Sequence, residues 1–129
     1  MWTEEFDPRQ RTIWVDVRIT GPVEKRLFTF VLDTGSPWTI IDPAVLDELG
    51  YGAHMGTTLH RAWAIGGAAR GYRIPIQRLE VMGFAVESCV VAAEDLPRDL
   101  GVDGLIGMDL IEGHVLHIDA ARGQLAVDP

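Results

Sequence analysis

The chain has 129 residues, 47% of them hydrophobic, and it carries 19 acidic against 11 basic side chains, a net charge of −8. A chain of this length fits one compact domain with a buried core, so we expect a single domain over residues 1–129. The excess of negative charge argues against nucleic acid or an anionic membrane surface as the main partner.

The first half of the chain predicts a hairpin, a sharp turn and a short helix. Apolar residues at positions 13, 15, 17 and 19 alternate with the residues between them, which is the period of a half-buried strand. A Gly-Pro pair ends this pattern, and a second apolar strand is expected over residues 27–32. Residues 38–41 predict a short strand, and Asp42 is expected to cap a helix that begins at Pro43 and stops at Gly50.

Strands also dominate the second half. Residues 59–92 predict several strands separated by glycines, and residues 115–119 alternate before a turn at Arg122-Gly123 leads into a last strand over 125–127. Many short strands with close turns and one or two short helices predict a mainly β, barrel-like domain. We see no linker, low-complexity segment or repeat.

The setting of the protein is indicated by three further features. Cys89 is the single cysteine and lies in an apolar run, which favours a buried, unreactive thiol and a fold without disulfides. The first eight residues have neither a basic start nor an apolar run, so no signal peptide is evident. No apolar stretch approaches the roughly 20 residues of a membrane span. We expect a cytoplasmic location without membrane contact, and the sequence leaves open an anchor further upstream.

Two motifs carry a resemblance to a known family. Leu32-Asp33-Thr34-Gly35-Ser36 resembles the active-site turn of aspartic proteases, and the segment Val-Asp-Gly-Leu-Ile-Gly at 102–107 resembles their second signature, with a short helix to follow at 108–111. The order of strand, turn, helix, glycine-containing hairpin, second signature and terminal strand extends over about residues 11–127. Asp-Thr-Gly alone is a common sequence, whereas this order is specific.

The chain holds one Asp-Thr-Gly, whereas pepsin-like enzymes carry one in each of two lobes of a much longer chain. It therefore resembles the single-domain retropepsins, including bacterial and retroelement-derived members. The resemblance implies a retropepsin-like acid protease barrel with a flap hairpin, and an active site that exists only in a homodimer. It implies an endopeptidase that acts on a peptide or protein substrate without a cofactor or metal.

One acid per chain is enough for this chemistry when two copies meet. Two neighbouring carboxyl groups cannot both ionise cheaply, so they share one proton, and aspartic proteases are a known example of this coupling. We therefore expect Asp33 to be the catalytic residue. By the resemblance, Thr34 is expected to hydrogen-bond across the dimer, and Gly35 to form the tight turn. Ser36 is expected to hydrogen-bond the outer oxygen of Asp33, although without the resemblance Thr34 and Ser36 are ordinary turn residues.

The hairpin over residues 63–72 lies where the family has its flap. We expect flap and substrate contacts from Trp63, Ile65, Gly66 and Gly67, and apolar subsite walls from Trp38, Ile65 and Leu105. A phosphate-binding glycine loop does not fit, because the spacing is not G-x-G-x-x-G and Pro75 opposes a following helix. An ordinary surface hairpin stays open as an alternative.

Charge is unevenly distributed along the chain. Between Glu48 and Glu80 there is no acid, yet four arginines lie in that span, at 61, 70, 73 and 78. If this segment covers the cleft, substrates with acidic residues near the cut are expected to bind better. A solvated basic edge that discourages strand pairing is the simpler interpretation.

Several other residues invite a catalytic interpretation that the pattern does not support. His114 and His117 have ligand spacing, but residues three apart on a strand point to opposite faces. Asp103 lacks the Thr/Ser-Gly that follows a catalytic acid, so we expect it to be structural.

Met108 stands where viral retropepsins have an arginine that pairs with an acid beyond the catalytic turn, so that ion pair is expected to be absent. Thr34 and the terminal strand at 125–127 are then the candidates for securing the dimer.

A different class of function fits the same sequence. A non-catalytic dimerisation or peptide-binding module could retain this fold, because fold does not imply function. A subunit that docks onto a different partner or a larger polypeptide is a third possibility. The intact Asp-Thr-Gly favours the enzyme.

Overall fold

The computed structural model describes residues 1–64 and 67–128, and for residues 60–64 and 67–70 it describes the backbone alone. Two short α-helices, α1 (Pro43–Glu48) and α2 (Met108–Ile111), and two 3-10 turns, η1 (Ala53–Met55) and η2 (Arg98–Leu100), accompany the strands. The strands are β1 (Trp2–Glu5), β2 (Trp14–Thr20), β3 (Lys25–Leu32), β4 (Ile40–Ile41), β5 (Thr58–Ala64), β6 (Gly67–Val81), β7 (Phe84–Ala93), β8 (Gly104–Ile106), β9 (Val115–Asp119) and β10 (Gln124–Asp128). The expected mainly β class is confirmed.

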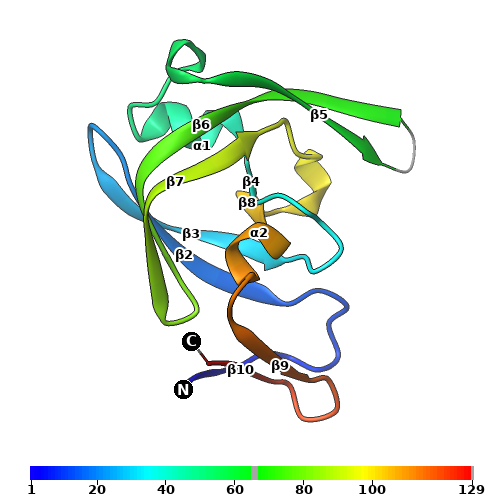
Figure 1. Ribbon diagram of the computed structural model, residues 1–129. Helices are drawn as coiled ribbons and strands as arrows, with labels where there is room; N and C mark the ends of the chain where they lie inside the picture. Colours follow the sequence, from blue (N-terminus) through cyan, green and yellow to red (C-terminus); the bar gives the residue numbers. More distant parts are fainter. Residues whose placement is uncertain (65–66, 129) are drawn as a thin grey trace.

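The larger sheet closes into a barrel (Figure 1). Its strands follow the order β2-β3-β8-β4-β7-β6, and β6 pairs back onto β2, while β5 extends from β6 as the outer strand of a hairpin. The expected β2–β3 hairpin is present, with Thr20 opposite Lys25 at its closed end. Closure pairs the barrel strands on both sides over only part of their length, because β6 meets β2 over residues 78–81 and β7 meets β4 over residues 92–93.

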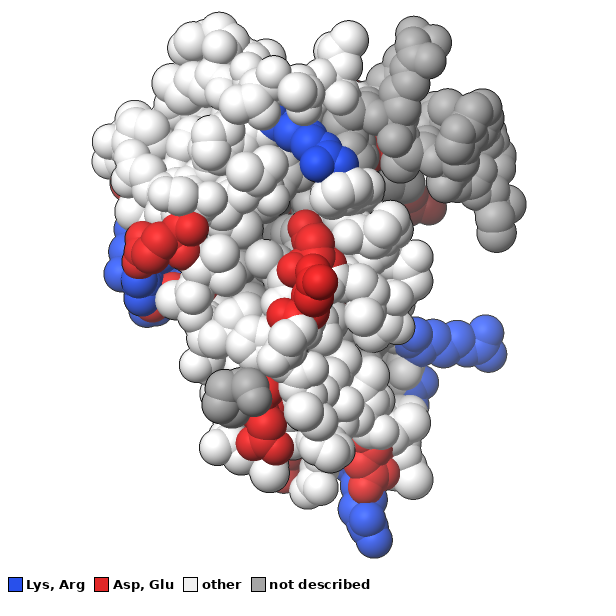
Figure 2. All heavy atoms as spheres, in the orientation of Figure 1, with Lys and Arg blue, Asp and Glu red and all other residues white. Residues whose placement is uncertain are grey.

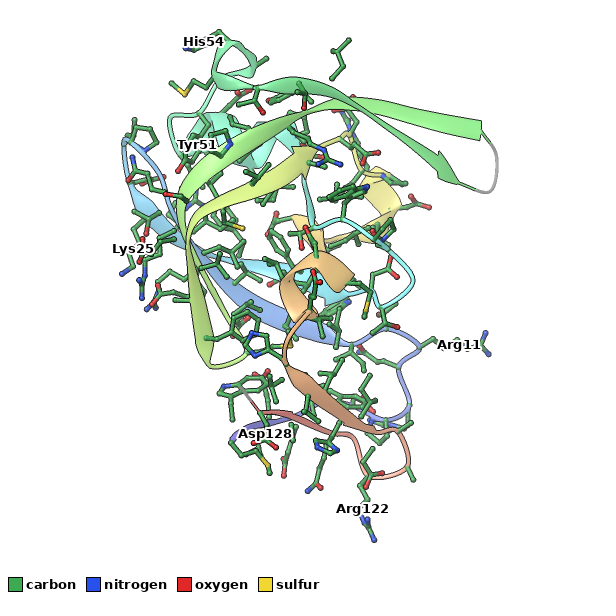
Figure 3. The ribbon with its side chains drawn as sticks, in the orientation of Figure 1. Arg11, Lys25, Tyr51, His54, Arg122 and Asp128 are labelled. Carbon is green, nitrogen blue, oxygen red and sulfur yellow. The ribbon has the colours of Figure 1, made fainter. Side chains whose placement is uncertain are left out.

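The helix α1 forms where the sequence predicts it. The Asp42 carboxylate accepts a hydrogen bond from the Ala44 backbone N–H at 2.9 Å, and Pro43 occupies the first turn, where a missing N–H costs nothing. Gly50 has a φ of 94°, which favours glycine and ends the helix. Tyr51 follows; its hydroxyl donates to the Thr20 carbonyl at 2.6 Å and ties the helix exit to β2 (Figure 3).

Apolar side chains from every barrel strand fill the interior. Because alternate residues of a strand face inward, the predicted period-two positions of β2 are buried at 2% exposure or less. The largest fully buried side chains come from strands far apart in sequence and from α1, and they include Ile19, Phe30, Ile41, Leu46, Ile74, Leu79, Ile106 and Leu125. Each such side chain contributes about 1.5–3 kcal/mol relative to exposure.

A second sheet lies below the barrel and joins the two ends of the chain (Figure 1). Its order is β1-β10-β9, antiparallel throughout, so β10 lies in the middle and pairs with β1 on one side and β9 on the other. Leu125 and Val127 of β10 are buried in the core of their own subunit. That residues 125–127 help to secure a dimer stays a prediction.

On the face shown in Figure 2, acidic and basic side chains lie in small separate groups rather than in one continuous patch. Within the part of the chain that the structure describes, no helix has the length and apolar character needed to cross a membrane.

Candidate active site

Asp33 lies at the end of β3, where the barrel strand gives way to the Asp-Thr-Gly turn. Its backbone N–H donates to the Ile106 carbonyl of β8 at 2.8 Å, which extends the parallel β3–β8 pairing by one hydrogen bond. The Asp33 carbonyl then accepts from the Ser36 N–H at 3.1 Å, closing a tight turn. The buried strand therefore places a half-buried carboxyl group at the barrel surface.

The carboxylate is held by the backbone of its own turn. The Gly35 N–H donates to Asp33 Oδ1 at 3.1 Å, and a Cβ on Gly35 would lie only 3.3 Å from the same oxygen. Thr34 and Gly35 are themselves exposed. This part of the turn therefore faces outward, next to the carboxyl group.

Ser36 differs from its expected role. Its hydroxyl donates to the Trp38 carbonyl at 2.7 Å, so its one proton is used within the loop and not on Asp33. The residue still supports the active-site loop, because this bond fixes the chain on the far side of the turn.

Thr39 joins the two signature segments. It is fully buried, its hydroxyl donates to Asp109 Oδ1 at 2.8 Å, and its oxygen accepts from the Gly107 N–H at 3.1 Å. The Met108 N–H also donates to the Ser36 carbonyl at 2.8 Å. These bonds connect the Asp-Thr-Gly turn to the start of α2.

Sequence reasoning did not identify Thr39 or Asp109. The available signals were a hydroxyl residue inside the apolar segment at 38–41 and an acid in the first turn of a helix that directly follows Leu-Ile-Gly. Neither signal predicts that Thr39 and Asp109 contact each other, because the two residues are 70 positions apart in the sequence.

Gly107 explains the glycine of the second signature. A Cβ at this position would lie 2.3 Å from the Trp38 carbonyl oxygen and 2.9 Å from the Ser36 carbonyl oxygen. Because backbone atoms cannot move aside cheaply, only glycine lets β8 and α2 approach the loop this closely.

A cavity of about 440 Å³ opens beside Asp33. Leu105, predicted as a subsite wall, lines it, and Arg11 contributes from the loop before β2, where its side chain extends away from the barrel (Figure 3). Asp33 is the only acid among the described residues that line it. The lining is otherwise mostly apolar or uncharged and comprises Thr12, Ile13, Val31, Leu32, Thr34, Leu100 and Ile118.

Trp38 does not line this cavity. Instead the Arg73 guanidinium carbon lies 3.5 Å from the centre of the Trp38 ring, a cation–π contact. Arg73 belongs to β6, near the base of the β5–β6 hairpin. The contact therefore joins the hairpin to the active-site loop.

The predicted hairpin is present as β5 and β6, with Trp63 opposite Ala68 and Ala64 opposite Gly67. Ile65 and Gly66 lie outside the described residues, as do the side chains of Trp63 and Gly67. Their predicted contacts with substrate stay predictions. Gly71, further along β6, is required by packing, because a Cβ there would lie 1.8 Å from the Ala93 carbonyl oxygen.

The residues that we set aside have structural contacts. The Asp103 carboxylate accepts from the Thr29 N–H at 3.1 Å, beside the β3–β8 pairing. His114 stacks on Phe84 with 4.1 Å between ring centres, whereas His117 lies near Asp128. Within the described residues, no three His, Cys, Asp or Glu side chains form a group that could hold a metal ion.

Cys89 is a poor nucleophile. Burial, reinforced by the nearby Asp109 carboxylate, raises the pKa of its thiol to about 12. The thiol is therefore protonated at neutral pH, and the thiolate is the reactive form.

Comparison with known proteins agrees with this arrangement. The family model described as aspartyl protease matches residues 15–110, which span the barrel from β2 to α2 and include both signature segments. No curated protein sequence matches the chain.

Solved structures of low sequence identity share the fold. A retropepsin-like aspartic protease from Rickettsia conorii superposes with a TM-score of 0.71 at 15% identity, covering 99% of both chains. The EIAV protease in complex with the inhibitor HBY-793 gives a TM-score of 0.60 at 15% identity, covering 83% of this chain and 91% of that one. The barrel thus has the retropepsin-like fold, and the chain belongs to the aspartyl protease family.

Proposed function

We propose that the protein is an aspartic endopeptidase whose active site is assembled from the Asp33 residues of two identical subunits. The observation that carries the proposal is the position of Asp33. It ends a buried strand, its carboxylate is held by Gly35, and it is the only acid among the described residues lining its cavity. Family and fold support aspartic protease activity, and a second copy supplies the second carboxyl group.

The reaction needs one proton shared between the two carboxyl groups. The ionised Asp33 takes a proton from a bound water while its oxygen attacks the scissile carbonyl carbon, and the protonated Asp33 donates to the carbonyl oxygen. The tetrahedral intermediate collapses with cleavage of the C–N bond, and a proton passes to the leaving nitrogen. The two carboxyl groups titrate as a coupled pair, so activity follows the two macroscopic pKa values of that pair and is greatest on the acid side of neutrality.

The substrate is an extended peptide bound between the subunits beneath the β5–β6 hairpin. The mostly apolar walls of the Asp33 cavity, including Leu105, favour an apolar side chain next to the cleaved bond. Trp63, Ile65, Gly66 and Gly67 of the hairpin are proposed to contact the peptide from above, and Trp38 through its contact with Arg73 to position the hairpin. Thr34 is proposed to hydrogen-bond to the partner's loop and fix the separation of the carboxyl groups.

Hydrolysis of a denatured protein at mildly acidic pH tests the proposal. Asp33→Asn is expected to reduce cleavage by at least about 10²–10⁴-fold, since it removes the general acid and base. Asp47→Asn is the matched control, because it makes the same chemical change at an exposed position on α1. Cleavage that persists in Asp33→Asn, or that Asp47→Asn abolishes equally, would place the chemistry elsewhere.

A further inference from the structure

Arg11 is the one basic residue among the described residues that line the Asp33 cavity. Asp33 is the one acid there, and its carboxyl group is used in the proposed reaction. The other lining residues are apolar or uncharged. A substrate carboxylate that enters this cavity therefore meets a single side chain of opposite charge, the Arg11 guanidinium.

The backbone holds Arg11 beside the Asp-Thr-Gly turn. The Leu32 N–H donates to the Ile13 carbonyl at 2.8 Å, so the loop before β2 runs alongside the end of β3. The same loop leads directly into β2, which pairs with β3 along its length. Arg11 therefore lies at the rim of the cavity, and its side chain extends outward (Figure 3), where an extended peptide can reach it.

Arg11 is not neutralised within its own chain. It is exposed, and within the part of the chain that the structure describes it makes no hydrogen bond or ion pair through its side chain. Arg9 of the same loop differs, because its guanidinium donates to the two oxygens of Asp7 at 3.1 and 3.2 Å. An unpaired guanidinium offers N–H donors in a planar fork, which fits a carboxylate through two parallel hydrogen bonds.

Two of the arginines that the sequence suggested for binding acidic substrates have other partners. Arg73 stacks on Trp38, and Arg78 pairs with Glu80 at 3.5 Å. Neither lines the Asp33 cavity. Among the described side chains, Arg11 is therefore the better-placed source of such a preference.

We propose that Arg11 determines substrate specificity by binding an aspartate or glutamate side chain of the peptide near the cleaved bond. The proposal rests on the proposed function and names its substrate class, which is peptides with an acidic residue close to an apolar cleavage site. In a symmetric dimer each copy contributes one Arg11, so an acidic residue is favoured on either side of the cleaved bond.

Peptides that differ in one residue test the proposal. A peptide that the unsubstituted chain cleaves is taken from the digest of a denatured protein, and each residue near the cut is changed in turn to glutamate, glutamine or lysine. At the position that Arg11 contacts, kcat/KM for the glutamate peptide is expected to exceed that for the glutamine peptide by about five- to tenfold. A bidentate pair of arginine and carboxylate near the surface has this order of magnitude.

Variants of the loop identify the arginine responsible. Arg11→Gln is expected to bring the glutamate-to-glutamine ratio close to one, and Arg11→Glu to favour the lysine peptide instead. Arg9→Gln is the matched control, because Arg9 is exposed on the same loop, does not line the cavity and is already paired with Asp7. It is expected to keep the ratio of the unsubstituted chain.

Two results would overturn the proposal. One is a glutamate-to-glutamine ratio that Arg11→Gln leaves unchanged, or that is close to one at every position in the unsubstituted chain. The other is loss of the dimer in both Arg11→Gln and Arg11→Glu, measured by sedimentation, because Arg11 would then belong to the contact between subunits.

The pH dependence of the same ratio provides a second readout. A glutamate side chain has an ordinary pKa near 4.3, whereas arginine stays protonated, so the ratio is expected to rise several-fold between about pH 3.5 and 5.5. Asp33 is the other charged group among the described residues that line the cavity, and its titration affects both peptides alike and cancels in the ratio. A preference for glutamate that does not change over this range would contradict recognition of the carboxylate.

Failure of this proposal differs from failure of the proposed function. Asp33-dependent cleavage without an Arg11-dependent preference would retain the protease and reject the role of Arg11. If no Asp33-dependent cleavage occurs, binding of labelled glutamate and glutamine peptides to Asp33→Asn protein measures the preference directly. Tighter binding of the glutamate peptide that Arg11→Gln removes would retain Arg11 as a carboxylate site, and equal binding would reject it.

Discussion

Thr39 shows how a single buried hydroxyl can hold the Asp-Thr-Gly turn in place. It has no exposed surface, and it bridges the Asp109 carboxylate and the Gly107 N–H. Because the loop and α2 come from distant parts of the chain, this bridge fixes the direction in which Asp33 leaves β3.

Thr39→Val is expected to lower the free energy of unfolding by about 1–3 kcal/mol, because it leaves a buried N–H and a carboxylate oxygen each short of one partner. Thr39→Ser keeps the hydroxyl and loses one methyl group, so about 1 kcal/mol is expected. Urea unfolding of the three proteins measures both values. Equal stability of Thr39→Val and the unsubstituted chain would show that the bridge contributes nothing.

The sequence identified the residues of the site that lie in a local motif and missed those that depend on distant contacts. Asp33, Gly35 and Leu105 were predicted from segments of five or six residues, and the structure brings the first and last together at one cavity. The Ser36 bond to Trp38 was missed, because a hydroxyl in a turn has several acceptors within reach and the sequence does not rank them.

At the scale of elements, the β5–β6 hairpin is connected to the active-site loop through its base. Arg73 stacks on Trp38, and the Thr57 N–H donates to the Arg73 carbonyl at 2.8 Å. The guanidinium of Arg73 is therefore directed at the loop and not only at solvent. Part of the predicted basic edge thus has a structural contact near the site.

Arg73→Gln is expected to raise KM by up to about tenfold with a smaller change in kcat, since a cation–π contact contributes about 0.5–2 kcal/mol and a loosened hairpin must be ordered by the substrate. Arg26→Gln is the matched control, because Arg26 lies over the Phe28 ring at 5.2 Å, at the start of β3. Steady-state cleavage of one peptide measures both variants. An unchanged KM in Arg73→Gln would contradict a role in positioning the hairpin.

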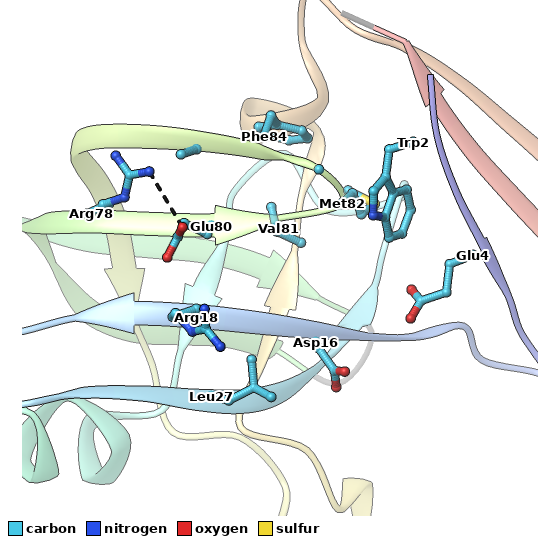
Figure 4. Close-up of a pocket in the computed structure, with 12 residues that line it drawn as sticks. Trp2, Glu4, Asp16, Arg18, Leu27, Arg78, Glu80, Val81, Met82 and Phe84 are labelled. Atoms are coloured by element: carbon cyan, nitrogen blue, oxygen red, sulfur yellow. Dashed lines mark ion pairs between the residues drawn. The ribbon is translucent and has the colours of Figure 1, made fainter.

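The strand β1 makes the terminal sheet sensitive to pH. Burial, with a contribution from the Asp16 carboxylate, raises the pKa of Glu4, and the two side chains face one another across the cavity in Figure 4. A raised folded-state pKa means that Glu4 contributes stability below its ordinary pKa near 4.5, and that this contribution is lost as pH rises through the folded-state value.

Glu4→Gln is therefore expected to become more stable relative to the unsubstituted chain as pH rises from about 4 to 7. Asp16→Asn is expected to show part of the same effect, because it removes the neighbouring charge and leaves the burial. Urea unfolding across this range provides the measurement. A stability difference between Glu4→Gln and the parent that is independent of pH would contradict the assignment.

Helices and strands were predicted correctly where the hydrophobic alternation or a helix cap is local in sequence. They were missed where a strand forms only because it pairs with a distant strand. The β2–β3 hairpin and α1 follow from alternation and from Asp42-Pro43. The strand β1 was not predicted, because four residues containing two glutamates show no strand pattern, and its structure depends on pairing with β10. The length of β6 likewise depends on successive partners, β5, β7 and β2.

At the scale of the whole molecule, the barrel and the terminal sheet have separate tasks. The barrel positions Asp33 and its cavity, and the terminal sheet joins the two ends of the chain. The barrel was predictable because its signature segments and hairpins are local in sequence. The middle position of β10 was not, because the order of strands in a sheet depends on both ends of the chain.

Mixing subunits tests the central claim that catalysis needs two Asp33 residues. A fixed amount of active protein is titrated with Asp33→Asn protein at concentrations at which both are dimeric. With equal amounts and random exchange, about a quarter of the dimers contain two active copies, so total activity is expected to fall to about half, and further with excess. Asp47→Asn subunits, added in the same amounts, are expected to increase activity. Activity that the Asp33→Asn subunits leave unchanged would contradict a shared active site.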